Sequence, residues 1–314
     1  MRKRIMTLML TVAAKLPLRR RHSTTSIWVE EFELTVWSAH FFFVILQAVM
    51  EKGTTRPLIL MSNDDGYAAK GINDLIEMVR PLGDVLVCAP DGPRSGQACA
   101  FSATVPLTLT LQRKEEGVEV WSCNGTPVDC VKMALANLCP HKPDMVIGGI
   151  NHGDNASVNT HYSGTMGVTL EGCMKYIPSV AFSLCDHRAD ADFEPLRPHV
   201  VSITKHVLEQ GLPLGVCLNV NFPLLEDAQT YKGVKVCRMS RGSWYNECTK
   251  CHHPRGYDYW WMVGHYHNDE PEATDTDRWA LDNGYVAITP TRIDVTAYEA
   301  MENLMHLETQ IFNV

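Results

Sequence analysis

The feature that most constrains the fold is a series of short, uninterrupted apolar segments that alternate with segments of helical periodicity. Leu58–Met61, Asp84–Pro90 and Asp144–Ile150 contain consecutive apolar residues, a pattern typical of strands that are buried on both faces. Between the first two, residues 72–79 repeat apolar side chains at the spacing of one helix face. This alternation predicts an α/β fold, in which helices cover both sides of a mostly parallel, three-layer, Rossmann-like sheet.

The remaining segments extend the same pattern. Thr126, Pro127 and Asp129 are typical of a helix start, with the threonine as N-cap, proline in the first position and aspartate reaching back. Other apolar runs predict strands at residues 105–111, 118–123, 179–184 and 215–221, and helical spacing predicts helices at 126–138, from 163 onward, and at 297–308.

After about residue 222 the pattern changes, because aromatic and polar residues dominate. The aromatic residues concerned are Trp244, Tyr245, Tyr257, Tyr259, Trp260 and Trp261. They favour an extended β arm or hairpin within about residues 222–290. Two roles stay open for them, contact between subunits and cover for the sheet edge within one subunit.

Charge is divided unevenly along the chain. The 314 residues have a net charge of −8, yet residues 1–49 contain seven basic and three acidic residues. The acidic remainder argues against nucleic-acid binding. The 11 cysteines, an odd number placed in apolar segments, indicate a reducing cytoplasm rather than a disulfide framework.

Residues 1–49 are expected to lie outside the folded domain, which spans residues 50–314. The segment begins like a weak signal peptide, but three arginines follow its short apolar run. A second apolar stretch, residues 37–50, is shorter than the roughly 20 residues of a spanning helix. We expect this extension to be either untranslated, with Met50 as the start, or disordered. A membrane-associated leader is the alternative. No membrane contact is expected for the core.

Four polar loops follow the predicted strands and helix starts: residues 62–66, 91–96, 151–155 and 162–165. Because parallel strands end at the same sheet edge, their side chains are expected to converge there. Asp64 and Asp65 are adjacent carboxylates at the end of a buried strand, and hard oxygen ligands suit magnesium, manganese or calcium. The alternative is that one of them only caps a helix.

Several ordered motifs resemble the SurE 5′-nucleotidase family over about residues 57–300. They are Ser62-Asn63-Asp64-Asp65-Gly66, Ala89-Pro90-Asp91 with Arg94-Ser95-Gly96, Gly125-Thr126-Pro127 with Asp129, Gly149-Ile150-Asn151 with Gly153 and Asn155, Tyr162-Ser163-Gly164-Thr165, Asn219-Val220-Asn221-Phe222-Pro223, and Gly284-Tyr285-Val286-Ala287. The resemblance implies a metal-dependent phosphatase acting on nucleoside 5′- and 3′-monophosphates and on short polyphosphate. It also implies a homodimer or homotetramer.

The resemblance assigns the site residues as well. It implies one divalent ion per subunit, Mg²⁺ or Mn²⁺ with Ca²⁺ possible in crystals, held by Asp64, Asp65, Ser95 and Asn151. Asp64 and Asn63 are the expected catalytic residues. The phosphate and substrate are expected at Gly96, Asn155, Ser163, Gly164 and Thr165, where a helix start offers free N–H groups.

Other interpretations remain. A doubly wound sheet also suits a non-catalytic nucleotide-binding regulatory module. An NAD-dependent or methyl-donor enzyme is disfavoured because no G-x-G-x-x-G follows the first strand. Cys248-Thr249-Lys250-Cys251-His252 matches a haem-attachment pattern and half of a zinc site, although no second C-x-x-C pair exists. Arg94 either contacts phosphate or pairs with Asp91.

Overall fold

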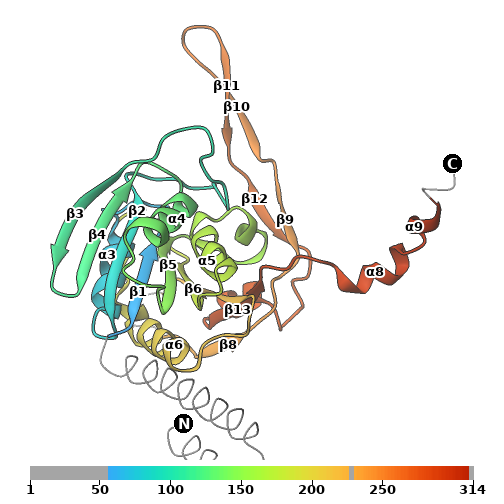
Figure 1. Cartoon of the computed structure of the whole chain (residues 1–314). Helices are drawn as coiled ribbons and strands as arrows, with labels where there is room; N and C mark the ends of the chain where they lie inside the picture. The colour runs from blue at the N-terminus through green and yellow to red at the C-terminus, as the bar shows by residue number, and fades with distance from the viewer. Residues whose placement is uncertain (1–55, 226–229, 311–314) are drawn as a thin grey trace, which may run out of the picture. The chain divides into compact units, whose positions relative to one another are not determined.

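A nine-stranded sheet forms the centre of the part of the chain that the computed structural model describes, residues 56–225 and 230–310 (Figure 1). The sheet order is β3-β4-β2-β1-β5-β6-β7-β13-β8. Its strands are β1 (Leu58–Ser62), β2 (Asp84–Pro90), β3 (Leu109–Glu115), β4 (Val118–Cys123), β5 (Met145–His152), β6 (Ser179–Leu184), β7 (Val216–Phe222), β8 (Val234–Val236) and β13 (Val286–Arg292). Only the β3–β4 and β7–β13 pairs are antiparallel. This confirms the mostly parallel α/β fold.

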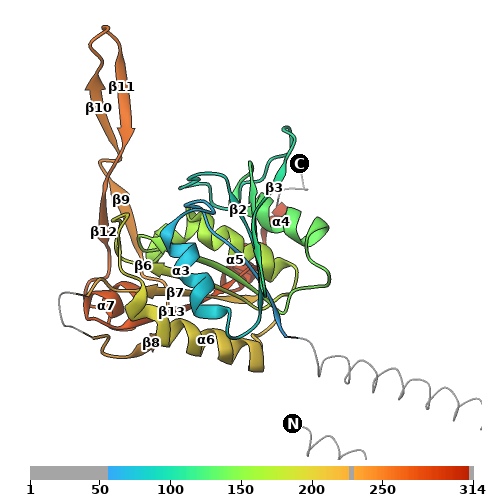
Figure 2. The same cartoon turned by 90° about the vertical axis from the view of Figure 1, so that its left-hand side faces the viewer.

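Helices cover both faces of the sheet, which gives the three layers (Figure 2). On one face, α3 (Lys70–Val79) and α6 (Arg197–Gln210) pack over Ile59 and Met61. On the other face, α4 (Pro127–Asn137) and α5 (Gly164–Met174) pack over Leu58 and Leu60. Alternate residues of β1 therefore enter opposite cores, as expected for a buried parallel strand.

The start of α4 follows from its sequence. The Thr126 hydroxyl accepts a hydrogen bond from the Asp129 backbone N–H at 3.1 Å, and the Asp129 carboxylate accepts one from the Thr126 N–H at 2.9 Å. Pro127 occupies the first turn, where its missing N–H costs nothing. The predicted capping role of Asp129 is confirmed.

Two antiparallel hairpin segments form an arm between β8 and β13 (Figures 1 and 2). Its inner part pairs β9 (Gly242–Tyr245) with β12 (His265–Asn268), and its outer part pairs β10 (Cys248–His252) with β11 (Asp258–Met262). Trp260 and Trp261 are exposed. Cys248 and Cys251 lie three positions apart on one strand and so point to opposite faces, which does not suit joint metal binding.

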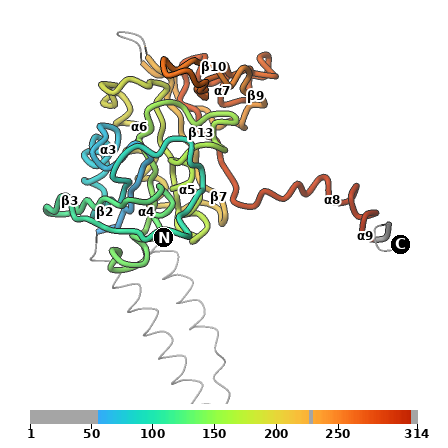
Figure 3. The backbone as a smooth tube through the Cα atoms, turned by 90° about the horizontal axis from the view of Figure 1, so that it is seen from above, coloured from blue at the N-terminus to red at the C-terminus, as the bar shows by residue number. Residues whose placement is uncertain are grey.

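The structure differs from the predicted elements at three places. The strand expected at 105–111 begins at Leu109, and the helix expected at 297–308 is divided into α8 (Tyr298–Leu304) and α9 (Leu307–Gln310). In Figure 3 the chain after β13 leaves the sheet, and no side chain of α8 is buried. Helix α6 was not predicted, although Val200, Ile203 and Val207 lie at helical spacing and pack on the core of this face.

Two short 3-10 turns, η1 (Ser157–His161) and η2 (Glu194–Leu196), and helix α7 (Asp277–Asp282) complete the fold. None of the helices within residues 56–225 and 230–310 combines the length and apolar character needed to cross a membrane. The predictions made for residues 1–49, and for Met50 as a start, fall outside the described residues.

Candidate metal and phosphate site

The loop after β1 carries the two adjacent carboxylates and is closed by Asn63. The Asn63 side chain accepts a hydrogen bond from the Gly66 N–H at 3.1 Å and donates one to the Gly66 carbonyl at 3.0 Å. Gly66 has a φ of +102°, which favours glycine. In this structure Asn63 is fully buried and shapes the turn that presents Asp64 and Asp65.

Asp64 is buried, with 4% of its surface exposed, and its Oδ1 accepts a hydrogen bond from the Thr165 hydroxyl at 2.6 Å. Burial raises the pKa of Asp64 to about 6, and the Asp65 charge adds to this, while the Thr165 hydrogen bond lowers it. No lysine or arginine is among the largest causes of the raised pKa. The carboxylate therefore lacks a compensating positive side chain.

Asp65 is half-buried, and burial raises the pKa of its carboxyl as well. Its Oδ2 accepts a hydrogen bond from the backbone N–H of His152, at a long 3.4 Å. This contact joins the loop after β1 to the end of β5, where Asn151 lies. Asn151 uses its amide nitrogen to donate to the Gly153 carbonyl at 2.8 Å, and its amide oxygen accepts no hydrogen bond from the described residues.

The loop after β2 is hydrogen-bonded to the loop that carries Asp64 and Asp65. The Arg94 N–H donates to the backbone carbonyl of Asp64 at 2.6 Å, and its guanidinium pairs with Asp91 at 2.8 Å. Of the two roles considered for Arg94, the structure contains the pairing with Asp91. Ser95 and Gly96 follow in the exposed part of this loop, where Gly96 has a φ of +75°.

The start of α5 packs directly against Asp64. Ser163 is the N-cap and its hydroxyl accepts a hydrogen bond from the Met166 N–H at 2.9 Å. At Gly164, a Cβ atom would lie 2.7 Å from the Asp64 Cβ, closer than carbon atoms approach. Only glycine therefore fits this position beside the carboxylate. The Thr165 hydroxyl donates to Asp64, the Met166 N–H donates to Ser163, and the Gly164 N–H also lowers the pKa of Asp64 as a hydrogen-bond donor. This helix start therefore directs N–H donors toward the carboxylate.

Asn155 is placed differently from the other expected site residues. Its backbone N–H donates to the Asn221 side chain at 2.7 Å, and its side-chain amide donates to the Ser183 hydroxyl at 2.8 Å. Asn219 in turn donates to the Asn155 carbonyl at 2.8 Å. Asn155 is thus held inside the protein and fixes the loop that follows β5.

Asn219 and Asn221 are supporting residues to which the sequence analysis gave no role. Both are fully buried on β7, in a segment where the neighbouring residues are apolar. A polar side chain at a buried strand position needs a hydrogen-bond partner. The alternation of asparagine with apolar residues on β7 is therefore the sequence signal for Asn219 and Asn221.

The donor set suits a hard divalent cation. Asp64 and Asp65 are two neighbouring carboxylates that form no ion pair with a lysine or arginine of the described residues, although His152 beside them lowers the pKa of Asp65. A divalent ion would balance their charge. The described residues contain no group of three or more His, Cys, Asp or Glu arranged to hold a metal, so neutral oxygens must complete the shell. Ser95 and Asn151 are neutral oxygen donors on the two adjoining loops. This composition matches Mg²⁺ or Mn²⁺ better than Zn²⁺.

Comparisons with known proteins agree with the motifs. The family model described as "Survival protein SurE" matches residues 59–246. Proteins called 5′-nucleotidase SurE are 56% identical in Phocaeicola vulgatus, over 82% of this chain and 98% of the relative, and 52% identical in Bacteroides thetaiotaomicron, over 79% and 95%. The crystal structure of the SurE protein from Aquifex aeolicus superposes with a TM-score of 0.68 at 37% identity, covering 80% of this chain and all of that one.

Proposed function

This chain belongs to the SurE family, and on that premise we propose that it is a 5′-nucleotidase, a phosphoric monoester hydrolase that releases phosphate from nucleoside 5′-monophosphates. The relatives that carry this name match it over nearly their whole length. The observation that carries the proposal is the contact between Asp64 and the start of α5, which sets a pair of carboxylates beside the N–H groups of a helix N-terminus.

We further propose that the enzyme depends on one divalent metal ion per subunit, Mg²⁺ or Mn²⁺. Asp64, Asp65, Ser95 and Asn151 would hold it through carboxylate, hydroxyl and amide oxygens. When bound, such an ion balances the two carboxylates, attracts phosphate oxygens and makes a bound water more acidic.

The protein's own groups would then orient the substrate. The N–H groups of residues 164 and 165 face the phosphate at a helix N-terminus, where the helix dipole favours negative charge. Thr165 occupies Oδ1 of Asp64 and thereby fixes the rotation of the carboxylate. Oδ2 stays open as a ligand or as the acceptor of the proton that the attacking water loses.

We extend the proposal to substrates, assembly and location. The substrates include 3′-monophosphates and short polyphosphate, which share the terminal phosphoryl group. The exposed aromatic residues of the β10–β11 hairpin support contacts between subunits in a homodimer or homotetramer. All 11 cysteines are free, which supports a cytoplasmic location.

Phosphate release from a nucleoside 5′-monophosphate tests the proposal. We expect release with Mn²⁺, none with chelator, and a loss of orders of magnitude in Asp64→Ala. Asp74→Ala is the control, since Asp74 pairs only with Lys70 on the surface of α3. Metal-dependent activity close to the parent in Asp64→Ala would refute the site. Nucleotide binding without release under any metal would favour the non-catalytic binding module instead.

A further inference from the structure

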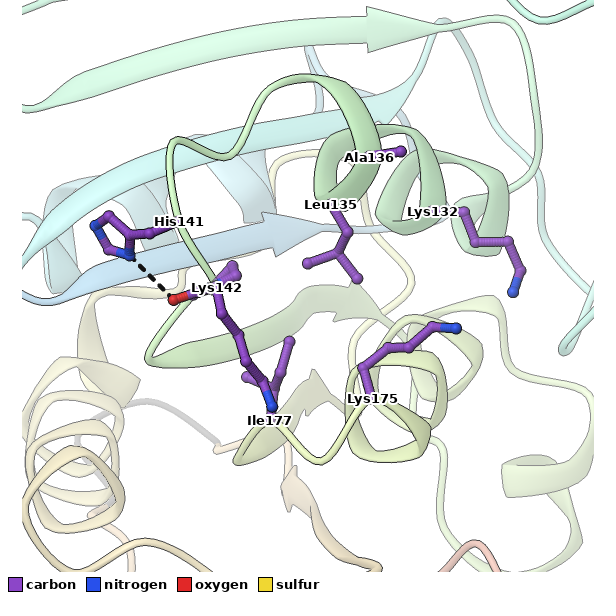
Figure 4. Close-up of a pocket in the computed structure, with 8 residues that line it drawn as sticks. Lys132, Leu135, Ala136, His141, Lys142, Lys175 and Ile177 are labelled. Atoms are coloured by element: carbon purple, nitrogen blue, oxygen red, sulfur yellow. Dashed lines mark hydrogen bonds between the residues drawn. The ribbon is translucent and has the colours of Figure 1, made fainter. Parts of the chain in front are cut away.

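A cavity lies on the opposite edge of the sheet from the carboxylates. It has a volume of about 590 Å³ and is lined by the last turns of α4 and α5 and by the segments that lead into β5 and β6 (Figure 4). Asp64 and Asp65 follow the carboxyl end of β1, whereas Pro143 and Ile177 precede the amino ends of β5 and β6. The 11 residues of α5 separate the two places by about 16 Å, at 1.5 Å per residue.

Basic side chains surround this cavity. Lys132, Lys142, Lys175 and His141 contribute to its lining, in a domain that is otherwise rich in acidic residues. The ends of α4 and α5 carry partial negative charge and would by themselves repel an anion. The three ammonium groups oppose this partial negative charge.

One buried carboxylate holds two of the lysines in place. Glu171, with only 3% of its side chain exposed, accepts an ion pair from Lys132 at 2.8 Å and lies 3.7 Å from the Lys175 ammonium. Figure 4 shows these two lysine side chains ending near each other. Because an ammonium has three donors, contact with Glu171 leaves protons for another anion. The three lysines against one glutamate leave an excess of positive charge.

The other lysine and the histidine are held by backbone groups. The Lys142 ammonium donates to the Tyr176 carbonyl at 3.2 Å, and the Nδ1 of His141 lies 3.1 Å from the Lys142 carbonyl oxygen. Both side chains are exposed. They lie on the other side of Leu135 from Lys132 and Lys175 in Figure 4.

The wall between the basic groups is aliphatic, and consists of Leu135, Ala136, Pro143 and Ile177. The volume is within the range of about 300–1,000 Å³ of small-molecule pockets and exceeds what a free phosphate needs. A ligand that fits must therefore combine several negative charges with a flat, largely apolar part. A nucleotide with more than one phosphate has this composition, with its base on the aliphatic wall and its phosphates on the lysines.

We propose that this cavity is a second nucleotide site, which binds a nucleoside di- or triphosphate separately from the phosphatase centre. Glu171 orients the lysines, Lys142 and Lys175 contact the phosphates, and the wall around Ala136 receives the base. The site needs no divalent ion, and it does not depend on the proposed catalytic activity.

Calorimetric titration of the full chain with ATP in the presence of EDTA tests the proposal. We expect one bound ATP, with an affinity about tenfold or more lower in Lys142→Gln/Lys175→Gln, because charge-assisted hydrogen bonds are lost. Lys205→Gln/Lys232→Gln removes the same charge at exposed positions outside the cavity and is expected to match the parent. Lys132 is left unchanged, since its loss would deprive a buried glutamate of its partner.

A second variant tests the wall rather than the charge. Ala136 is exposed at the end of α4, so Ala136→Glu is expected to fold normally, as checked by thermal unfolding, and to prevent ATP binding by repulsion and bulk. AMP and inorganic pyrophosphate are the matched ligands, and each is expected to bind more weakly than ATP. Pyrophosphate binding as tight as that of ATP would refute a role for the wall, and with it the nucleotide assignment.

Lysine acylation followed by mass spectrometry locates the ligand. We expect ATP to protect Lys142 and Lys175 and to leave Lys205 reactive. Equal reactivity of Lys142 with and without ATP would overturn the proposal. A loss of ATP binding in Asp64→Ala with EDTA present would also overturn it, because the ligand would then be in the phosphatase centre. Neither result bears on whether the chain is a phosphatase, which the phosphate-release assay tests separately.

Discussion

Gly164→Ala is the sharpest test of the candidate site, because it changes one atom at a known place. The added Cβ would lie 2.7 Å from the Asp64 Cβ and 3.0 Å from its Oδ2, whereas ordinary contact begins at 3.4 Å. Asp64 must therefore move by about 0.7 Å, or α5 must shift away from it. A misplacement of about 1 Å at a reacting centre can cost about a hundredfold in rate.

We expect kcat/KM for a nucleoside monophosphate to fall by about one hundredfold in Gly164→Ala, with weaker binding of Mn²⁺. Helix propensity acts in the opposite direction, since alanine favours a helix over glycine by about 1 kcal/mol. Loss of activity with an almost unchanged melting temperature would therefore point to the displaced carboxylate rather than to unfolding.

Gly92→Ala is the matched control for this experiment. Gly92 lies in the adjoining loop after β2, and a Cβ added there meets no atom within 4 Å. We expect parent-like activity and Mn²⁺ affinity in this variant. Gly164→Ala with the same kinetics as Gly92→Ala would refute the reasoning, because the close approach of α5 to Asp64 would then have no role.

Three further predictions address the same centre and the helix that supports it. Thr165→Val removes the hydroxyl that donates to Asp64, and we expect its Mn²⁺ affinity, measured by calorimetry, to fall about tenfold. Thr165→Ser keeps the hydroxyl and is expected to stay near the parent. Equal Mn²⁺ affinities in the two variants would contradict this. Saturating Mn²⁺, at about 100 times its Kd, is expected to stabilise the protein by about 2.7 kcal/mol, seen as a higher melting temperature in the parent and absent in Asp64→Ala. Asp129→Ala removes the carboxylate half of the α4 capping box and leaves the Thr126 N-cap in place. It is expected to destabilise the fold by about 1 kcal/mol in urea unfolding at neutral pH, with kcat retained. Burial opposes the ionisation of Asp129, but hydrogen bonds from Ser102 and Thr126 outweigh this effect and lower its pKa. The stability that Asp129 contributes is therefore present above the unfolded pKa of about 3.9 and is lost as the pH falls through the lower folded value. A difference in unfolding free energy between Asp129→Ala and the parent that persists unchanged at lower pH would contradict this.

The central sheet was predictable because its strands are buried on both faces. Short apolar runs such as those at β1, β2 and β5 are typical of buried parallel strands, and the Thr126–Asp129 cap is a local signal. Helix α6 was missed although Val200, Ile203 and Val207 fall at the spacing of one helix face, so its signal was present in the sequence. The last helix was predicted too long, because α8 buries no side chain that would hold a continuous helix together.

The site was predictable to the level of loops but not of individual contacts. Parallel strands require the loops after β1, β2 and β5 to share an edge, and the hydrogen bonds from Arg94 and His152 to the aspartates show that they meet. That the Thr165 hydroxyl binds Asp64, and that Asn155 faces inward, depends on side-chain rotation and on distant residues of β7. No local sequence pattern encodes either.

The cost of burying Asp64 links the fold to the proposed chemistry. A buried carboxylate whose pKa rises to about 6 is mostly ionised at neutral pH, next to a second carboxylate and without a lysine or arginine beside it. Such an arrangement destabilises the folded chain by itself, since burial of an unpaired charge is unfavourable. The Thr165 hydroxyl and the neighbouring backbone N–H groups lower the pKa of Asp64 but do not offset the effect of its burial. Gly164 brings α5 against Asp64, and Thr165 fixes one of its oxygens. Gly164 and Thr165 hold Asp64 in one orientation although its charge is unfavourable there. A divalent cation would explain this arrangement, because it would attract both carboxylates and replace their mutual repulsion.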